Sequence, residues 1–307
     1  MKVAIIGANG FIGRHLTEHL AADKELSLHL FGRSPLSHFD SRFPYSQIDF
    51  FNQAELVKNF SGVDVVYYLA SETIPSSSWE NPLIEIEKNL KPFLSFLNVV
   101  SPLHIKKIVF VSSAGTVYGP SSGKVDELAN KQPFSPYGIV KLSMENFLNY
   151  YKAKFGLEYD IYRVSNVYGE GQDTSKGLGI INTFLEKIIR DKKVQVFGDG
   201  NNTRNYIYVK DVATLMGYSL NHLNSSEIFN VSSNTTCSIN ELVTTMRKVV
   251  QEQFDVDYTP SRLSDNSFID LDNSKIQKYN KSFEFTPISE GIQKTYHALK
   301  NQTKTTK

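Results

Sequence analysis

Short apolar runs alternate with longer amphipathic segments over the first 165 residues. The apolar runs lie at 2–7, 26–31, 45–50, 64–70, 107–113 and 158–164, and segments of helical period lie at 11–22, 53–59, about 83–100 and 137–155. Alternating strands and helices predict a parallel sheet with helices on both faces. We therefore expect an α/β fold built on a doubly wound parallel sheet.

The pattern changes after Asn166. The stretch 168–179 is rich in glycine and polar residues, and it precedes a predicted helix near 180–190. A helix from 210 to 223 and a strand-like run at 227–233 follow, so the chain returns to the first domain before a last lobe begins. We expect a first domain over 1–165 with a return at about 206–231, and a smaller C-terminal α/β lobe over 166–205 and 232–307.

Composition limits the possible partners and the location. The chain has 307 residues, is 40% hydrophobic and carries a formal net charge of +1, so no strong field attracts nucleic acid or an anionic membrane. No apolar run reaches the roughly 18 residues that a membrane span needs. Cys237 is the single cysteine, and His15 and His19 have no evident third ligand, so we predict no disulfide and no metal site. These features are typical of a cytoplasmic protein.

A glycine-rich segment follows the first predicted strand. Gly7, Gly10 and Gly13 stand between the apolar run 2–7 and the first predicted helix. In this context the first glycine permits a tight turn, the second lets the backbone approach a pyrophosphate, and the third brings the helix close to the strand. Free N–H groups at the helix N-terminus favour an anion. The segment predicts a Rossmann-type dinucleotide-binding domain.

Tyr137 and Lys141 stand four residues apart near the start of a predicted helix. Ser135 is a suitable N-cap, and Pro136 suits the first helical position. The spacing places both side chains on one face of the helix. An ammonium group beside a phenol stabilises the phenolate and lowers its pKa, so we expect Tyr137 to exchange a proton with a substrate hydroxyl.

Five segments in this order resemble the extended short-chain dehydrogenase/reductase superfamily, specifically its NAD-dependent epimerase/dehydratase family. They are the glycine-rich loop, VSSAGTVYG at 111–119, SPYGIVK at 135–141, RVSNVYG at 163–169 and GDGNNTRNYIYVKDV at 198–212. The resemblance runs from residue 1 to about 275. It implies a nicotinamide cofactor in the Rossmann domain, a nucleotide-diphosphate sugar as substrate in the second lobe, and a homodimer that forms through the helices at about 83–100 and 137–155.

The resemblance also implies roles for individual residues. Tyr137 corresponds to the general acid/base, and Lys141 to the residue that lowers its pKa and binds the nicotinamide ribose. Asn166, Arg204 and Arg262 resemble contacts to the nucleotide and the diphosphate, a role that suits guanidinium groups, although a surface position is the alternative for Arg262. The implied cofactor contacts are Gly7, Gly10, Phe11, Ile12, Gly13, Asp49, Phe50, Tyr137 and Lys141.

One catalytic position departs from the family pattern. The family's catalytic serine or threonine stands four residues before the tyrosine of the VYG segment, and this chain has Ala114 there. Ser113 and Thr116 are the nearby hydroxyls, and we expect one of them to hydrogen-bond the reacting oxygen. The sequence leaves the choice between the two open.

The cofactor site also departs from the pattern. NAD-binding members carry an acid at the end of the second strand, where it accepts hydrogen bonds from the adenosine ribose and repels the 2′-phosphate of NADP. This chain has Gly32 and Arg33 at that place. A guanidinium offers donors to a phosphate, so the sequence permits NADP(H) as well as NAD(H). The alternative is that Arg33 stacks on adenine or points to solvent while NAD binds.

Two reactions fit these residues. Gly32 and Arg33 favour a 4-keto-6-deoxy nucleotide-sugar reductase that uses NADPH, and the alternative is a UDP-hexose 4-epimerase with tightly bound NAD. Both transfer a hydride at sugar C4. A dehydratase of this family would carry an acidic pair after the active-site threonine. The segment 114–116 reads AGT and has no acid, so 4,6-dehydration is disfavoured. A non-catalytic sensor of cofactor or nucleotide sugar is the alternative from another class, and the presence of Tyr137 and Lys141 argues against it.

Overall fold

The computed structural model describes residues 1–39, 41–121, 123–175, 177, 179–260 and 269–305. The chain divides into two compact units. The first unit comprises Met1–Tyr118, Asn130–Arg163 and Ala213–Phe229, and the second comprises Gly119–Ala129, Val164–Val212 and Asn230–Lys307.

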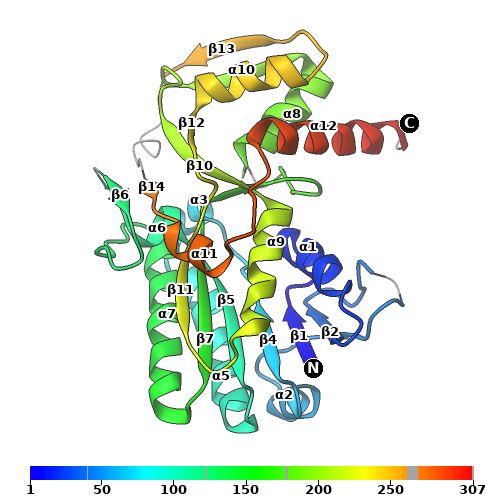
Figure 1. Cartoon of the computed structure of the whole chain (residues 1–307), viewed down its shortest axis with the longest axis vertical. Coiled ribbons are helices and arrows are strands. Elements are labelled where there is room, and N and C mark those ends of the chain that lie inside the picture. Colours follow the sequence, from blue (N-terminus) through cyan, green and yellow to red (C-terminus); the bar gives the residue numbers. More distant parts are fainter. Residues whose placement is uncertain (40, 122, 176, 178, 261–268, 306–307) are drawn as a thin grey trace. The chain divides into compact units, whose positions relative to one another are not determined.

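A seven-stranded sheet with the order β11-β7-β5-β4-β1-β2-β3 forms the centre of the first unit (Figure 1). Its strands are β1 (Lys2–Ile6), β2 (Ser27–Gly32), β3 (Tyr45–Gln47), β4 (Val65–Tyr68), β5 (Lys107–Ser113), β7 (Glu158–Val164) and β11 (Glu227–Val231). β1 pairs in parallel with both β2 and β4, so the direction of winding reverses between β1 and β4. In such sheets ligands bind at the carboxyl ends of the strands beside this reversal. The predicted Rossmann-type α/β fold is confirmed.

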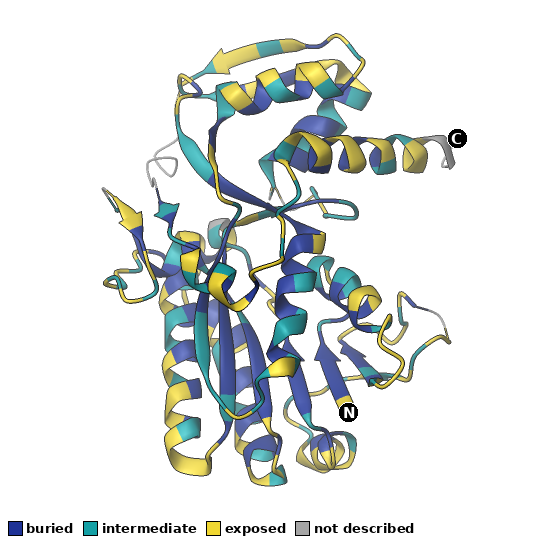
Figure 2. Ribbon diagram, viewed as in Figure 1, coloured by how far each residue is buried: buried dark blue, intermediate teal, exposed yellow. Residues whose placement is uncertain are grey.

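Helices cover both faces of this sheet. On one face α2 (Gln53–Phe60), α5 (Lys91–Val100) and α7 (Pro136–Phe155) share a core cluster with strand residues such as Phe31, Tyr68 and Phe110. On the other face the hydroxyls of Tyr67 and Tyr162 donate hydrogen bonds to backbone carbonyls of α9 (Val209–Gly217). α1 (Phe11–Leu20) completes that layer. Figure 2 shows the central strands as almost entirely buried, as strands covered on both faces must be.

Two predicted helices are interrupted. The segment 83–100 consists of α4 (Leu83–Glu85), a π-helical turn η1 (Ile86–Leu90) and α5, instead of one α-helix. Pro92 has no backbone N–H and cannot continue the α-helical hydrogen bonding, which accounts for a change of helix type just before it. The helix predicted at 210–223 ends at Gly217 and continues as a 3-10 turn, η3 (Tyr218–Asn221).

The remaining elements of the first unit are short. They are α3 (Pro75–Glu80), the 3-10 turn η2 (Ser101–Leu103) and α6 (Ala114–Val117). α6 directly follows β5, and α3 follows β4, so both lie just beyond the carboxyl ends of central strands.

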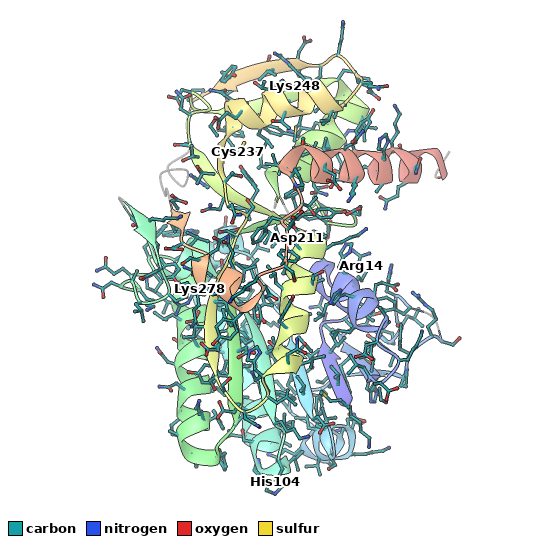
Figure 3. All side chains as sticks on the ribbon, viewed as in Figure 1. Arg14, His104, Asp211, Cys237, Lys248 and Lys278 are labelled. Atoms are coloured by element: carbon teal, nitrogen blue, oxygen red, sulfur yellow. The ribbon has the colours of Figure 1, made fainter. Side chains whose placement is uncertain are left out.

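The described residues of the second unit form three small sheets. Its strands are β6 (Lys124–Val125), β8 (Asn166–Tyr168), β9 (Lys193–Phe197), β10 (Thr203–Tyr208), β12 (Thr236–Ser238), β13 (Asp255–Thr259) and β14 (Asp270–Leu271). Its helices are α8 (Ile180–Asp191), α10 (Ile239–Val249), α11 (Ser274–Tyr279) and α12 (Ile288–Thr305). Asp211 and Cys237 both belong to this unit (Figure 3). The Asp211 carboxylate accepts hydrogen bonds from the backbone and the hydroxyl of Thr286, and these bonds fix the chain ahead of α12.

Among the described residues no helix combines the length and the apolar character that crossing a membrane requires. Nor do these described residues include a group of three or more histidine, cysteine, aspartate or glutamate side chains that could hold a metal ion.

Candidate active site

The glycine-rich loop joins β1 to α1 and leaves no room for side chains at its three glycines. Gly7 has a φ of +86°, a left-handed conformation that favours glycine. A Cβ atom on Gly13 would lie 2.2 Å from the Gly7 carbonyl oxygen, and one on Gly10 would lie 3.0 Å from it. The first N–H groups of α1 have no acceptor within the helix and can bind an anion. The loop therefore fits the pyrophosphate of a dinucleotide, with Phe11 and Ile12 at the helix start.

The start of α7 brings Tyr137 to the end of β5. The Ser135 hydroxyl accepts a hydrogen bond from the backbone N–H of Gly138 at 3.1 Å, so it caps the helix as predicted. Gly138 allows a close approach, because a Cβ atom there would lie 2.3 Å from the Thr116 carbonyl oxygen. Tyr137 therefore lies next to the α6 segment that contains Ala114 and Thr116.

Lys141 lies one turn further along the same helix. Its Nζ donates a hydrogen bond to the Val111 carbonyl oxygen at 3.1 Å, and it lies 5.6 Å from the centroid of the Tyr137 ring and 5.0 Å from that of Phe110. The residue is buried. The strand carbonyl and the two rings fix the ammonium group beside the tyrosine.

The pKa values of this pair differ from the prediction made for it. Loss of solvent raises the pKa of Tyr137 to about 12, Ser71 lowers it through a side-chain hydrogen bond, and the charge of Glu85 raises it. Burial lowers the pKa of Lys141 to about 8, while the charges of Glu85 and Glu145 raise it. The expectation that Lys141 brings the Tyr137 pKa toward neutrality is wrong for the protein alone, because desolvation is the largest effect at both groups.

The hydroxyls near Ala114 are partly engaged elsewhere. Thr116 Oγ1 donates to the Ser113 carbonyl oxygen at 3.3 Å. The adjacent Ser112 hydroxyl donates to the carboxylate of Glu145 at 2.5 Å, and that carboxylate also binds Arg163 in a buried ion pair. Ser71, which acts on the pKa of Tyr137, comes from the loop after β4, where its hydroxyl donates to the Thr73 carbonyl oxygen at 3.4 Å. No motif marks it, because its proximity to Tyr137 depends on the fold.

The residue at the end of β2 has an acidic partner. Arg33 forms an ion pair with Glu72, which follows β4, and the exposed fractions of their side chains are 78% and 33%. Arg33, the predicted contact to the 2′-phosphate, is therefore paired with a carboxylate that is 39 residues away in sequence. A carboxylate beside Arg33 repels a phosphate and reduces the attraction that the guanidinium alone would provide.

Asp49 and Phe50 are the two predicted cofactor contacts that follow β3. Asp49 is exposed, and its Oδ1 accepts a hydrogen bond from the backbone of Phe51 at 2.9 Å. Phe50 is half-buried, with its ring 5.8 Å from that of Tyr68 and 6.1 Å from that of Phe96. Asp49 can thus face a ligand, while Phe50 belongs mainly to the core.

Asn166 and Arg204 lie on neighbouring strands of the second unit. β8 and β10 are parallel and pair Asn166 with Tyr206. The Asn166 amide donates to the Asn205 carbonyl oxygen at 2.9 Å, and Arg204 Nη1 donates to the Thr203 carbonyl oxygen at 2.9 Å. The third residue of this predicted set, Arg262, lies outside the described residues.

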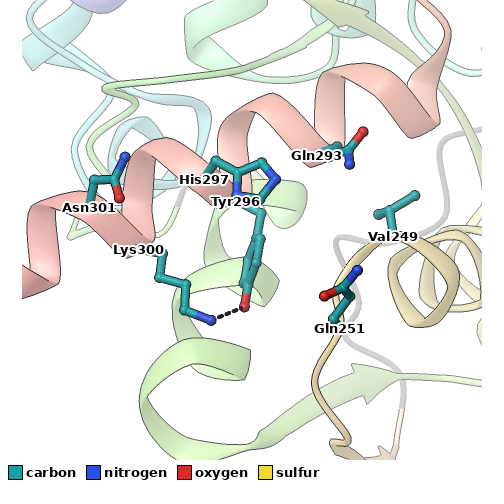
Figure 4. A pocket seen from close by; sticks show the side chains of 7 residues that line it. All are labelled: Val249, Gln251, Gln293, Tyr296, His297, Lys300 and Asn301. Carbon is teal, nitrogen blue, oxygen red and sulfur yellow. Dashed lines mark hydrogen bonds between the residues drawn. The ribbon is translucent and has the colours of Figure 1, made fainter.

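A separate pocket lies in the second unit between α12 and the end of α10. It has a volume of about 280 Å³, and none of the predicted site residues lines it. Figure 4 shows the hydrogen bond between Lys300 Nζ and the Tyr296 hydroxyl at its edge, 3.0 Å long. The Glu252 carboxylate accepts hydrogen bonds from both groups, so Tyr296 and Lys300 have partners within the protein. The lining residues are Val249, Gln251, Gln293, Tyr296, His297, Lys300 and Asn301.

Comparison with known proteins relates this site to one family. The model described as the NAD dependent epimerase/dehydratase family matches residues 3–232. A Methanocaldococcus jannaschii protein, named provisionally as a UDP-glucose 4-epimerase, is 32% identical over 307 residues that cover 99% of this chain and 100% of the relative.

Solved structures agree with this match. UDP-glucose 4-epimerase with UDP-glucose from Thermotoga maritima has a TM-score of 0.90 and 25% identity, covering 99% of this chain and 100% of that chain. The complex of Thermus thermophilus UDP-glucose 4-epimerase with NAD has a TM-score of 0.87 and 25% identity, covering 98% of this chain and 99% of that chain.

Proposed function

Because the chain belongs to the NAD-dependent epimerase/dehydratase family, we propose that it is a UDP-sugar 4-epimerase that uses NAD. The observation that carries this proposal is the Tyr137–Lys141 pair beside a dinucleotide loop, in a chain similar over its whole length to proteins named as UDP-glucose 4-epimerases. The same similarity favours the epimerase over the reductase expected from Gly32 and Arg33. The ion pair of Arg33 with Glu72 also weakens the argument for NADPH.

The proposed reaction moves a proton and a hydride away from sugar C4 and then returns both. The Tyr137 oxygen takes the proton of the C4 hydroxyl while the hydride leaves C4, and a 4-keto sugar results. After the 4-keto sugar has rotated to present its other face, Tyr137 returns the proton to the C4 oxygen and the hydride returns to C4 on that face. The chemistry that bound NAD supplies is the acceptance and return of this hydride. There is no net oxidation or reduction, so the cofactor is not consumed.

The other residues bind and orient in this proposal. Gly7, Gly10 and Gly13, with the backbone N–H groups of Phe11 and Ile12, hold the pyrophosphate. Lys141 holds the nicotinamide ribose and keeps a positive charge near the Tyr137 oxygen, which stabilises the phenolate. In the second unit Asn166 and Arg204 contact the nucleotide and the diphosphate of the substrate, and we assign the substrate lobe to that unit.

A homodimer remains our expectation for the assembly. α7 exposes the large apolar side chains of Ile139, Tyr150 and Phe155, and η1 exposes Ile86. These are the helices through which the family resemblance predicts contact. Sedimentation at micromolar concentration should give a dimer, and a monomer throughout would contradict this expectation.

The experiment that tests the function measures both the bound cofactor and the stereochemistry. Protein denatured directly after purification should release NAD, and the native protein should interconvert UDP-glucose and UDP-galactose, or their N-acetylated or uronic acid counterparts, without net change in reduced cofactor. Tyr137→Phe should retain NAD and lose at least about 10²-fold in turnover, as expected for a general acid/base.

The reductase would give a different result. Stoichiometric consumption of NADPH with a 4-keto-6-deoxy nucleotide sugar, and no interconversion of 4-epimers, would replace the epimerase with the reductase. A protein without turnover that binds nucleotide sugar equally well in the Tyr137→Phe form would favour the non-catalytic sensor.

A further inference from the structure

A buried guanidinium group links α6, α7 and β7 of the first unit. Arg163 is the next-to-last residue of β7, and only 2% of its side chain is exposed. Its Nη2 donates a hydrogen bond to Glu145 Oε2 at 2.6 Å, and its Nε lies 3.1 and 3.2 Å from the two oxygens of that carboxylate. Its Nη1 donates to the Tyr118 hydroxyl at 2.8 Å. Arg163 therefore joins β7 to α7 through Glu145 and to the end of α6 through Tyr118.

Glu145 lies on the same side of α7 as the proposed catalytic pair. Tyr137, Lys141 and Glu145 follow one another at intervals of four residues. Lys141 Nζ bonds the Val111 carbonyl oxygen at 3.1 Å. Glu145 Oε1 accepts a hydrogen bond from the hydroxyl of the next residue in β5, Ser112, at 2.5 Å. Two consecutive residues of β5 thus hold this side of α7.

The other end of the Arg163 network holds α6. This helix follows Ser113 and contains Thr116, the two hydroxyl residues expected beside the reacting oxygen. α6 is in close contact with α7, because a Cβ atom on Gly138 would lie 2.3 Å from the Thr116 carbonyl oxygen. Tyr118 caps the end of α6, is buried, and has its ring centroid 5.0 Å from the Arg163 guanidinium carbon. The Arg163 side chain therefore controls the spacing between α6 and the helix that carries the proposed general base.

The Arg163 guanidinium remains charged in this buried position. Burial acts to lower the pKa of Arg163, but the hydrogen bonds and the charge of Glu145 raise it above its usual value. Charge-assisted bonds to a carboxylate are stronger and more directional than neutral ones, and a forked guanidinium can bind two partners at once. The network is thus suited to fixing a distance between two helices.

We propose that Arg163 is a positioning residue for the reaction at Tyr137. This inference rests on the proposed function. Anchored by Glu145, the guanidinium holds Tyr118 and with it α6 at a fixed spacing from the side of α7 that carries Tyr137 and Lys141. Arg163 exchanges no proton with the sugar. Its effect is geometric, because proton transfer requires the hydroxyl groups around the reacting oxygen to lie within hydrogen-bond reach of it.

Arg163→Lys is the direct test. A lysine keeps a positive charge beside Glu145, so the buried carboxylate remains paired and the protein should fold. A single ammonium group lacks the fork that reaches Glu145 and Tyr118 together, so α6 loses its attachment. We expect kcat to fall by about 10-fold or more, while KM for the UDP-sugar and the amount of NAD retained through purification change by less than about 2-fold. A wild-type kcat in Arg163→Lys would overturn the proposal.

Tyr118→Phe is a second, milder variant. It removes one hydrogen bond of the guanidinium and leaves the ion pair with Glu145 in place. kcat should fall in the same direction as in Arg163→Lys, again with little change in KM. An unchanged kcat in Tyr118→Phe would contradict the view that the link to α6 is what matters.

Asp160→Asn is the matched control for a merely structural effect. Asp160 lies on the same strand as Arg163 and also forms a buried ion pair, but its partner is Lys107 of β5. This variant should lower the stability of the protein and leave the kcat of the folded enzyme unchanged. If kcat falls in Asp160→Asn as far as in Arg163→Lys at equal loss of stability, the role of Arg163 is only structural and the proposal fails.

A readout that needs no turnover separates failure of this inference from failure of the proposed function. Backbone hydrogen exchange of residues 114–118 can be followed by mass spectrometry in the NAD-loaded protein. Arg163→Lys and Tyr118→Phe should both accelerate exchange in this segment by about 10-fold or more, and Asp160→Asn should not. Wild-type exchange in Arg163→Lys would reject the positioning role whatever the reaction is. Faster exchange in a protein that interconverts no UDP-sugar would support the hold of Arg163 on α6 and reject the epimerase alone.

Discussion

Lys141 Nζ lies 5.6 Å from the centroid of the Tyr137 ring while it donates a hydrogen bond to the Val111 carbonyl oxygen. The lysine is therefore held by β5 and directed toward the tyrosine one turn before it on α7. Burial raises the pKa of Tyr137 to about 12 and lowers that of Lys141 to about 8. Both shifts favour the neutral side chains, whereas the proposed reaction needs the Tyr137 phenolate and the Lys141 ammonium. Nearby charges therefore determine the pH range in which the pair is active.

Glu85 is the charge that acts on both members of this pair. It is buried, and its Oε1 has no hydrogen-bond partner among the described residues. Its carboxylate raises the pKa of Tyr137 and that of Lys141. In Glu85→Gln both pKa values should fall, so the acidic and the alkaline limbs of the kcat profile should both move to lower pH.

Glu87→Gln is the matched control for Glu85→Gln. Glu87 lies two residues away and is exposed, so solvent screens its charge and the pH profile should keep its wild-type limbs. Equal shifts in the two variants would point to a change in overall charge and would contradict a specific effect of Glu85.

The ion pair of Arg33 and Glu72 leads to a prediction about the choice between NAD(H) and NADP(H). Glu72→Gln leaves the guanidinium of Arg33 without its acidic partner, so affinity for NADP(H) should rise relative to NAD(H). The pair is largely exposed, and we expect a change of no more than about 10-fold. Titration of cofactor-free protein with both reduced cofactors measures the ratio. Arg33→Ala should lower affinity for NADP(H) and leave that for NAD(H) nearly unchanged, and a large loss of NAD(H) affinity would contradict this account.

The glycine-rich loop allows a test of cofactor binding that does not depend on turnover. A Cβ atom in Gly13→Ala would meet the Gly7 carbonyl oxygen at 2.2 Å and the backbone of Ala8 at 2.9 Å. These are rigid backbone atoms, so α1 must shift from β1, and NAD retained through purification should fall by at least about 10-fold. Gly123→Ala is the control, because a Cβ atom there meets nothing within 4 Å. Unchanged NAD content in Gly13→Ala would contradict the proposed pyrophosphate site.

Local features of this fold could be predicted from the sequence, and long-range pairings could not. Ser135, Pro136 and the loop glycines act through neighbours a few residues away, so their patterns identify the start of α7 and the turn before α1. Glu72, the partner of Arg33, comes from the loop after β4 and meets Arg33 only when the sheet forms. Burial determines the pKa values of Tyr137 and Lys141, and a sequence pattern does not supply it.

Lys106 and Lys107 are adjacent residues in different environments, and they permit a matched test of stability. Lys107 is fully buried, and its Nζ donates to Asp160 Oδ2 at 2.8 Å and to the His222 carbonyl oxygen at 2.6 Å. Lys106 pairs with Asp64 at 2.9 Å, but 54% of its side chain is exposed. Lys107→Met removes the ammonium group from the buried carboxylate of Asp160, which keeps the His222 Nε2 atom 3.0 Å from its Oδ2, and should lower the free energy of unfolding by about 3–5 kcal/mol.

Lys106→Met should lower the free energy of unfolding by no more than about 1 kcal/mol, because solvent screens an exposed pair. Denaturant unfolding of both variants measures the difference. The double variant Lys107→Met/Asp160→Asn removes both buried charges, so it should be destabilised by less than the sum of the two single changes. Equal losses in Lys106→Met and Lys107→Met would show that burial does not distinguish the two lysines, and additive losses in the double variant would contradict a direct ion pair between Lys107 and Asp160.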